Sequence, residues 1–287
     1  MGGGRDYFVV LKMGHHIQQL RTIVSPMKMG VFCHNCFSVL LCPLHAQSQG
    51  TVSYSIEFRY KDVFPESFTG ELYFDAHQSV FRFDRNTKIL PKSDALETAG
   101  SAPIKMEKGR TTDSLGRIVF TDFIGKTQVT RDFIRKKPFI VPDTLVAATR
   151  ELKNEQKKIG SFNCQKAVTR FYGREYEVWY TPEVPVVFGP WKLNGLPGLI
   201  LEVSSADGEI KFMALQVSLT LKDHHIVKAP TGGEVIKGGY LAFRKLQDQK
   251  AEEIGKYVKS LANEVQKPGA PVSVGKTTVQ RIEKAID

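Results

Sequence analysis

The sequence predicts an α+β protein that is mainly β: a curved antiparallel sheet followed by one long C-terminal helix over residues 240–266. Two observations carry this prediction. From Thr51 to Leu219, apolar and polar residues alternate in short runs separated by turn residues, which is typical of antiparallel strands. After Tyr240 the apolar residues recur every three or four positions, which indicates an amphipathic helix able to cover a sheet.

The first half of the chain supplies most of the predicted strands. The segment from Thr51 to Lys61 places large apolar side chains on one face, at Val52, Tyr54, Ile56, Phe58 and Tyr60. Further strands are predicted at 70–75, 79–85, 117–123, 127–135 and 136–141, the last ended by Pro142 and Asp143. A hairpin turn is expected at 76–78 and another at Gly125, whereas residues 86–114 read as a long loop.

The second half adds two hairpins and the helix. Residues 145–158 fit either a short helix or a loop. One hairpin spans 163–181 with its turn near Gly173, and the other spans 199–221 with its turn at Asp207-Gly208. Residues 231–239 lack the flanks of a phosphate-binding loop and read as a linker. The helix stripe ends at Pro268-Gly269, after which we expect a loose tail; its members are Phe243, Leu246, Ile254, Tyr257, Val258, Leu261 and Val265.

The N-terminal region predicts export. Residues 27–46 combine a basic start at Lys28, an apolar stretch, and a small residue at Ala46 followed by polar residues, which is the order of a cleaved signal peptide. Residues 1–26 are then an extension upstream of the true translation start, at Met27 or Met29. The mature chain is one domain, 47–287, that we expect in the periplasm or at the cell surface, without a transmembrane helix.

An alternative reading of the same region is a zinc site. Ligand-type residues stand at Cys33, Cys36, Cys42 and His45. Apolar residues fill the intervening loop and provide no polar support for metal ligands, so the signal peptide is favoured and no metal or cofactor is expected.

The net charge of +10 does not predict nucleic-acid binding. Basic residues are spread along the chain and alternate with acidic ones, as in 245–260, and no nucleic-acid motif is present. A soluble domain with a basic surface explains the charge better than a nucleic-acid partner does.

An unusual connection lies between Thr181 and Gly198. Its prolines fix φ and its glycines permit positive φ, so we expect a rigid path anchored by a buried Trp191. The peptide Gly195-Leu196-Pro197-Gly198-Leu199-Ile200, with 157–167 and 173–185 around it, resembles the GLPGLI family. That resemblance implies a secreted or periplasmic envelope protein of certain Gram-negative bacteria, in a family without an established activity. The strand order also resembles the half-barrel of periplasmic lipoprotein carriers, an analogy of fold alone.

No residue pattern predicts catalysis. Cys164 lies in a strand without a neighbouring histidine and is expected to be buried and inert. His224 and His225 are expected on a loop surface, and Glu175 and Glu177 on an exposed strand face. The residues singled out for interaction are Trp179, Phe188, Trp191, Gly195, Leu196, Pro197 and Gly198.

Two function hypotheses remain open. The first is a non-catalytic binding or carrier protein that holds a hydrophobic molecule or lipid between sheet and helix, with uptake insensitive to salt. It requires an apolar cavity. The second is an accessory partner of an outer-membrane or periplasmic complex that uses the 181–198 loop, and it requires an exposed aromatic patch at Phe188 and Trp191.

We predict that the exported protein begins at Gln47, because the apolar stretch, Ala46 and the polar residues after it define one cleavage point. Mass spectrometry of the protein recovered from the cell envelope measures this directly. Recovery of a product that still carries residues 1–26 would contradict both the start site and the cleavage site.

Overall fold

The computed structural model describes residues 49–61, 65–88, 112–265 and Ile282, and all of them belong to one compact unit, His45–Asp287. Several predictions fall outside the described residues. They concern the extension, the signal peptide, the zinc alternative, most of the 86–114 loop, and the stop at Pro268-Gly269.

The described strands form a single 12-stranded sheet in the order β12-β6-β5-β4-β3-β2-β1-β11-β10-β9-β8-β7. In chain order they are β1 (Gly50–Phe58), β2 (Glu66–Phe74), β3 (Gln78–Lys88), β4 (Arg117–Asp122), β5 (Thr127–Ile134), β6 (Lys137–Thr144), β7 (Thr149–Ile159), β8 (Phe162–Phe171), β9 (Arg174–Thr181), β10 (Leu199–Ser205), β11 (Ile210–Ser218) and β12 (Glu234–Val235). A short helix, η1 (His224–Ile226), and the long helix α1 (Gly239–Val265) complete the elements.

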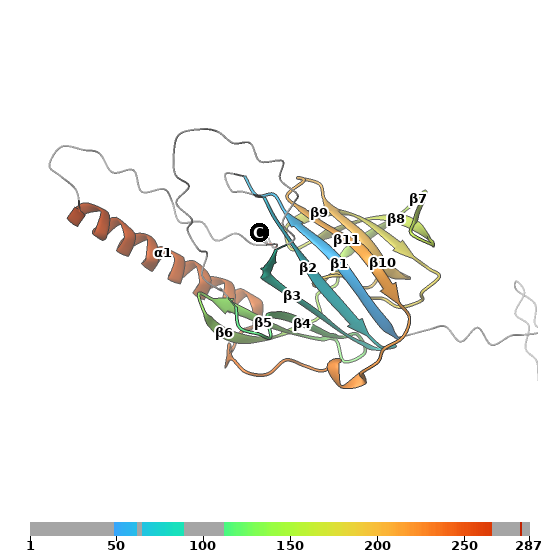
Figure 1. Cartoon of the computed structure of the whole chain (residues 1–287), viewed down its shortest axis with the longest axis horizontal. Coiled ribbons are helices and arrows are strands. Elements are labelled where there is room, and N and C mark those ends of the chain that lie inside the picture. Colours follow the sequence, from blue (N-terminus) through green and yellow to red (C-terminus); the bar gives the residue numbers. More distant parts are fainter. Residues whose placement is uncertain (1–48, 62–64, 89–111, 266–281, 283–287) are drawn as a thin grey trace, which may run out of the picture. The chain divides into compact units, whose positions relative to one another are not determined.

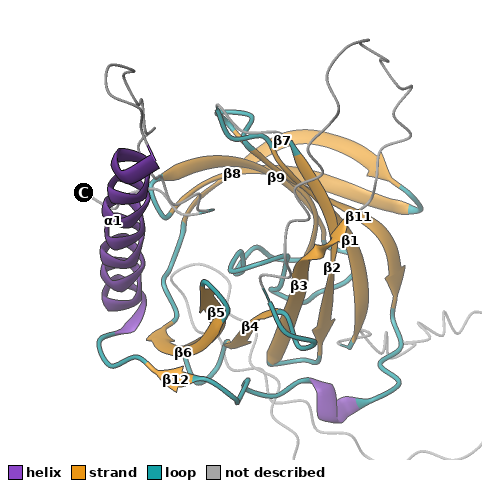
Figure 2. Cartoon of the chain, turned by 60° about the vertical axis from the view of Figure 1, so that its left-hand side comes forward, coloured by secondary structure: helices purple, strands orange, loops and turns teal. Residues whose placement is uncertain are grey.

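The sheet is open and strongly curved (Figures 1 and 2), and its neighbours are antiparallel except for the parallel pair of β12 and β6. This confirms the predicted fold class, including the long C-terminal helix. In the described part of the chain, no helix is long and apolar enough to cross a membrane.

Local sequence explains the strands and their turns. Every second residue of β1 is buried, from Val52 to Phe58, because one face of the sheet carries the core. Asp75 fixes the turn between β2 and β3, since its carboxylate accepts backbone hydrogen bonds from His77 and Gln78, both at 2.8 Å. These features confirm the predicted hairpin at 76–78.

Three local predictions need correction. The region predicted as helix or loop, 145–158, contains most of β7, an edge strand with charged, exposed side chains and an irregular register against β8. An edge strand of this kind lacks an apolar alternation because it buries neither face. The strand predicted at 136–141 continues as β6 through Pro142 to Thr144. Strand β12 pairs only with an earlier part of β6, so Pro142 lies outside that pairing. The predicted linker 231–239 contains β12 itself.

The main core lies on the inner face of the sheet and draws on the strands, the connection between β9 and β10, helix α1 and Ile282. A smaller second cluster contains Val80, Ile118, Phe120, Leu221 and Val227. The strands supply the residues expected from alternation, namely Tyr54, Phe58, Phe74, Phe81, Phe83, Val178 and Tyr180, all buried. The connection between β9 and β10, residues 182–198, adds six residues to the same cluster, namely Val184, Val186, Phe188, Trp191, Leu193 and Leu196. The Tyr54 hydroxyl donates a 2.6 Å hydrogen bond to the carbonyl oxygen of Ile200, which ties β1 to the end of this connection.

Helix α1 stands at the opening between the two ends of the sheet, one formed by β12 and β6 and the other by β8 and β7 (Figure 2); we call this opening the seam. Phe243 packs on Phe139 of β6 with ring centroids 5.8 Å apart. Tyr240 packs on Tyr172, in the turn after β8, at 5.3 Å. The carboxylate of Asp143 accepts a 3.0 Å hydrogen bond from the Tyr240 backbone N–H, one of the donors that a helix start leaves unsatisfied. Helix α1 thus packs at the seam, where Tyr240 and Phe243 belong to the same core cluster as the inward-facing strand residues.

After α1 the structure describes only Ile282, and this residue packs in the main core cluster. Ile282 is buried, and its carbonyl oxygen accepts a 2.9 Å hydrogen bond from Arg174 Nε. The prediction of a loose tail therefore does not hold at Ile282.

We predict that Trp191→Ala destabilises the protein by about 3–5 kcal/mol, because the ring is 5 % exposed and packs on Phe171 and Tyr172. Trp191 has φ +57°, a conformation that costs a residue with a Cβ about 1–2 kcal/mol. Trp191→Gly should therefore be at least as stable as Trp191→Ala, the reverse of the usual order. Denaturant unfolding of the three proteins measures both effects, and an unchanged midpoint for Trp191→Ala would contradict the packing role.

We also predict that Cys164 is unreactive in the folded protein. Its side chain is 2 % exposed, and burial raises the pKa of the thiol from 9.0 to about 11. Alkylation by iodoacetamide at neutral pH should therefore be slower than in the unfolded chain by ~100-fold or more, since the thiolate is the reactive form. Cys164→Ala should keep the fold at a cost of about 1–2 kcal/mol. Rapid labelling without denaturant is the contrary outcome.

Candidate functional site

The residues singled out in the connection face the core. Phe188 is 1 % exposed, Trp191 and Leu196 are also buried, and only Pro197 of this set is exposed. Phe188 and Trp191 therefore do not form the exposed aromatic patch that the partner hypothesis requires.

The glycines of the connection have structural explanations. Gly195 has φ +84°, which favours glycine. At Gly198 a Cβ atom would overlap the carbonyl oxygen of Thr181, so the close approach of two backbone segments excludes a side chain. Gly195 and Gly198 are therefore explained by the backbone path of the connection.

Trp179 lies apart from the connection, on the opposite face of β9 from Val178 and Tyr180. Its Nε1–H donates a 3.0 Å hydrogen bond to Glu177, and Lys157 Nζ lies 4.3 Å from the ring centroid. The ring is only 8 % exposed and belongs to the main core cluster, so Trp179 is a buried residue and not an exposed interaction site.

The other residues considered for catalysis or metal binding have ordinary structural or surface roles. Glu175 forms an ion pair with Arg170 at 3.1 Å, and Glu177 forms one with Lys166 at 2.8 Å. The hydrogen bond from Lys166 lowers the pKa of Glu177, which disfavours a proton-donor role. His224 and His225 are exposed in η1, as expected for a surface position, and the described residues contain no cluster of metal-ligand side chains.

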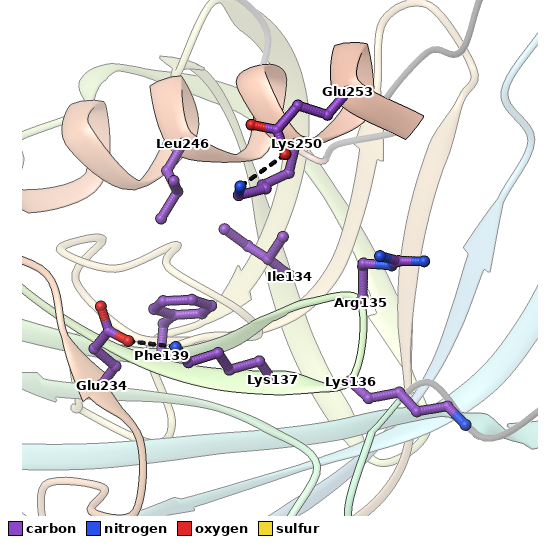
Figure 3. A pocket seen from close by; sticks show the side chains of 9 residues that line it. All are labelled: Ile134, Arg135, Lys136, Lys137, Phe139, Glu234, Leu246, Lys250 and Glu253. Carbon is purple, nitrogen blue, oxygen red and sulfur yellow. Dashed lines mark hydrogen bonds and ion pairs between the residues drawn. The ribbon is translucent and has the colours of Figure 1, made fainter. Parts of the chain in front are cut away.

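A cavity of about 500 Å³ lies where α1 meets the turn between β5 and β6 and the short strand β12 (Figure 3); we call it the seam pocket. It is lined by Ile134, Arg135, Lys136, Lys137, Phe139, Glu234, Leu246, Lys250 and Glu253. The end of β5 contributes Ile134, β6 contributes Phe139, and α1 contributes Leu246. Figure 3 shows these three apolar side chains grouped between helix and strands, with charged side chains around them.

Helix geometry explains how the pocket arises. Phe243, Leu246, Lys250 and Glu253 follow one another at steps of three or four residues and therefore share one face of α1. Phe243 is buried against β6, Leu246 is half-buried, and Glu253 is exposed. The helix face thus changes from apolar to charged as α1 leaves the sheet, and the space that opens along it is the seam pocket.

Ion pairs occupy both walls of the pocket. Lys137 Nζ lies 2.5 Å from Glu234 and also 5.4 Å from the centroid of the Phe139 ring. On the helix, Lys250 Nζ lies 2.7 Å from Glu253. These side chains are largely exposed, so the pairs contribute little stability and can rearrange around a guest. The arrangement offers apolar contact and charge at its rim.

Sequence reasoning missed this site because its parts are far apart in the chain. The available signal was the basic run Arg135-Lys136-Lys137 between apolar Ile134 and Phe139. Basic residues in a hairpin turn are usually exposed to solvent, so the run alone does not indicate a binding site. It does so only when Leu246 of the helix is known to lie beside it.

Comparisons with known proteins add a partial family match and fold similarities. Residues 135–235, less than half of the chain, match the family described as N-glycanase peptide, N-terminal domain. Two solved structures of PNGF-II are similar, one with TM-score 0.47, 16 % identity and 71 % of this chain covered, the other with TM-score 0.45, 17 % identity and 71 % covered. The similar region spans 34 % and 33 % of those chains, so this chain covers only about a third of their length.

A LolA superfamily protein from Nitrosomonas europaea is similar over 63 % of this chain and 90 % of its own, with 10 % identity and TM-score 0.28. No curated protein matches the sequence. At these identities and TM-scores, the similarities carry no information on ligand or activity.

Proposed function

We propose that this protein is a non-catalytic binding module that holds a hydrophobic ligand in the seam pocket. The observation that carries the proposal is the group of Ile134, Phe139 and Leu246 around a cavity of about 500 Å³. That volume lies within the ~300–1,000 Å³ typical of ligand pockets. Five of the lining residues are exposed, namely Arg135, Lys136, Lys137, Glu234 and Glu253, so the pocket opens to solvent and a ligand can reach it without unfolding the helix.

The burial of apolar chain is the expected source of affinity. Each methylene that leaves water contributes about 0.8 kcal/mol, so a few methylenes on the apolar wall give weak to moderate binding. The charged groups of the pocket, including Lys137 over the Phe139 ring, belong to exposed side chains that can rearrange, which favours a flexible chain over a rigid, multiply hydrogen-bonded ligand.

The proposal keeps the non-catalytic role that the sequence predicts. Its support is that three carboxylates considered for chemistry, Glu234 and Glu253 at the pocket and Glu177 on the sheet, all form ion pairs with lysines. The alternative role, a partner in an envelope complex, loses support because Phe188 and Trp191 are buried. Export to the cell envelope and membership of the GLPGLI family remain part of the proposal on sequence grounds alone.

The test is binding of lauryl alcohol, an uncharged single chain, measured by displacement of a neutral hydrophobic dye and by calorimetry. We expect binding with a negative heat-capacity change, the mark of apolar burial. Leu246→Gln should weaken it about tenfold, since a polar group in the wall costs ~1–3 kcal/mol.

The matched control is Leu241→Gln, the same substitution in the same helix at a side chain that is 66 % exposed and outside the pocket. It should leave the affinity unchanged. No binding to the unsubstituted protein would refute the proposed function, and equal binding by Leu246→Gln would place the ligand elsewhere.

A further inference from the structure

The charges around the seam pocket do not balance. Its lining carries the basic residues Arg135, Lys136, Lys137 and Lys250 and the acidic residues Glu234 and Glu253. Both carboxylates are used by lysines, at 2.5 Å on the strand side and 2.7 Å on the helix side. Arg135 and Lys136 form no ion pair with any described residue, which leaves two positive charges at the pocket uncompensated.

The uncompensated charges lie at a defined place. Arg135 and Lys136 form the turn between β5, which ends at Ile134, and β6, which begins at Lys137. Arg135 has φ +59°, so the two-residue turn has a fixed backbone although its side chains are exposed. Figure 3 shows both charged ends at the rim, directed away from Phe139. The apolar wall and the positive charge are therefore neighbouring but separate parts of the pocket.

We infer that the ligand is a fatty-acid anion, with its chain along Ile134, Phe139 and Leu246 and its carboxylate at the Arg135-Lys136 turn. This inference rests on the proposed function and names the ligand class of the same site. Charge complementarity selects an anion over a neutral or cationic head. The guanidinium fork of Arg135 matches the geometry of a carboxylate, and Lys136 adds a second donor.

The inference changes one expectation from the sequence. Uptake driven by apolar contact alone is insensitive to salt, whereas an exposed carboxylate–guanidinium contact is screened as ionic strength rises. The affinity that comes from apolar contact should therefore persist at about 1 M salt, where the Debye length is ~3 Å. The additional affinity that comes from the charged contact should disappear.

The test compares laurate with lauryl alcohol, which share the chain and differ in the head. At low salt we expect laurate to bind about fivefold to tenfold more tightly, as expected from two exposed charge contacts. In Arg135→Gln/Lys136→Gln this preference should disappear while the affinity for lauryl alcohol stays unchanged. The double variant keeps both turn positions polar, and its melting temperature checks the fold.

The matched control is Lys222→Gln/Lys228→Gln, which removes the same charge from exposed positions outside the pocket. It should keep the preference for laurate. Equal affinity for laurate and lauryl alcohol in the unsubstituted protein overturns this inference and leaves the proposed function intact, and so does a preference that survives in the Arg135-Lys136 double variant. Failure of both ligands to bind overturns the proposed function itself.

Discussion

The structure depends on covering one face of a single curved sheet. Alternation in the strands produces an inner face of large aromatic and aliphatic side chains, which must be removed from water for the sheet to be stable. Only one long helix is described, and it packs at the seam. The connection 182–198 therefore acts as the second layer, with Phe188 and Trp191 buried in the same cluster as Tyr54. Its prolines and glycines are explained by this role, because a covering layer without regular secondary structure needs a fixed path.

The seam pocket follows from the same constraint. Since the connection fills the inner face, α1 is left to bridge the ends of the sheet, where it is fixed at its start by Asp143, Tyr240 and Phe243. Beyond the first turns the helix diverges from β6, so Leu246 is only half-buried. An incompletely covered apolar surface beside a basic turn is thus a consequence of how few elements are available to close the sheet. This is why the binding proposal concerns the seam and not the centre of the core.

Much of the fold was predictable from sequence, and the failures have physical causes. Period-two alternation identifies a strand with one buried face, as in β1, and turn chemistry locates its ends, as at Asp75. The same signal is absent from β7, which exposes both faces, and from β12, whose two residues pair with β6 through a contact distant in sequence. The pocket was not predictable because Phe139 and Leu246 meet only through the path of α1. The prolines and glycines of the connection predict its rigidity. They do not predict the burial of Phe188, which depends on the part of the sheet that the connection covers.

The connection also contacts α1, the helix that forms one wall of the pocket. Lys192, directly after Trp191, is buried, and its Nζ lies 3.9 Å from the ring centroid of Tyr240 and 4.9 Å from that of Tyr172. A buried cation held against aromatic faces is a costly arrangement to disturb, because separation would remove these favourable contacts from the charge. Tyr240 belongs to the first turn of α1, so the position of the helix start depends on the connection. Leu246 follows Tyr240 by six residues in the same helix, so the contacts that hold the helix start also bear on where this wall of the seam pocket lies. The connection thus helps to position the helix that forms one wall of the pocket, although none of the connection's own side chains lines it.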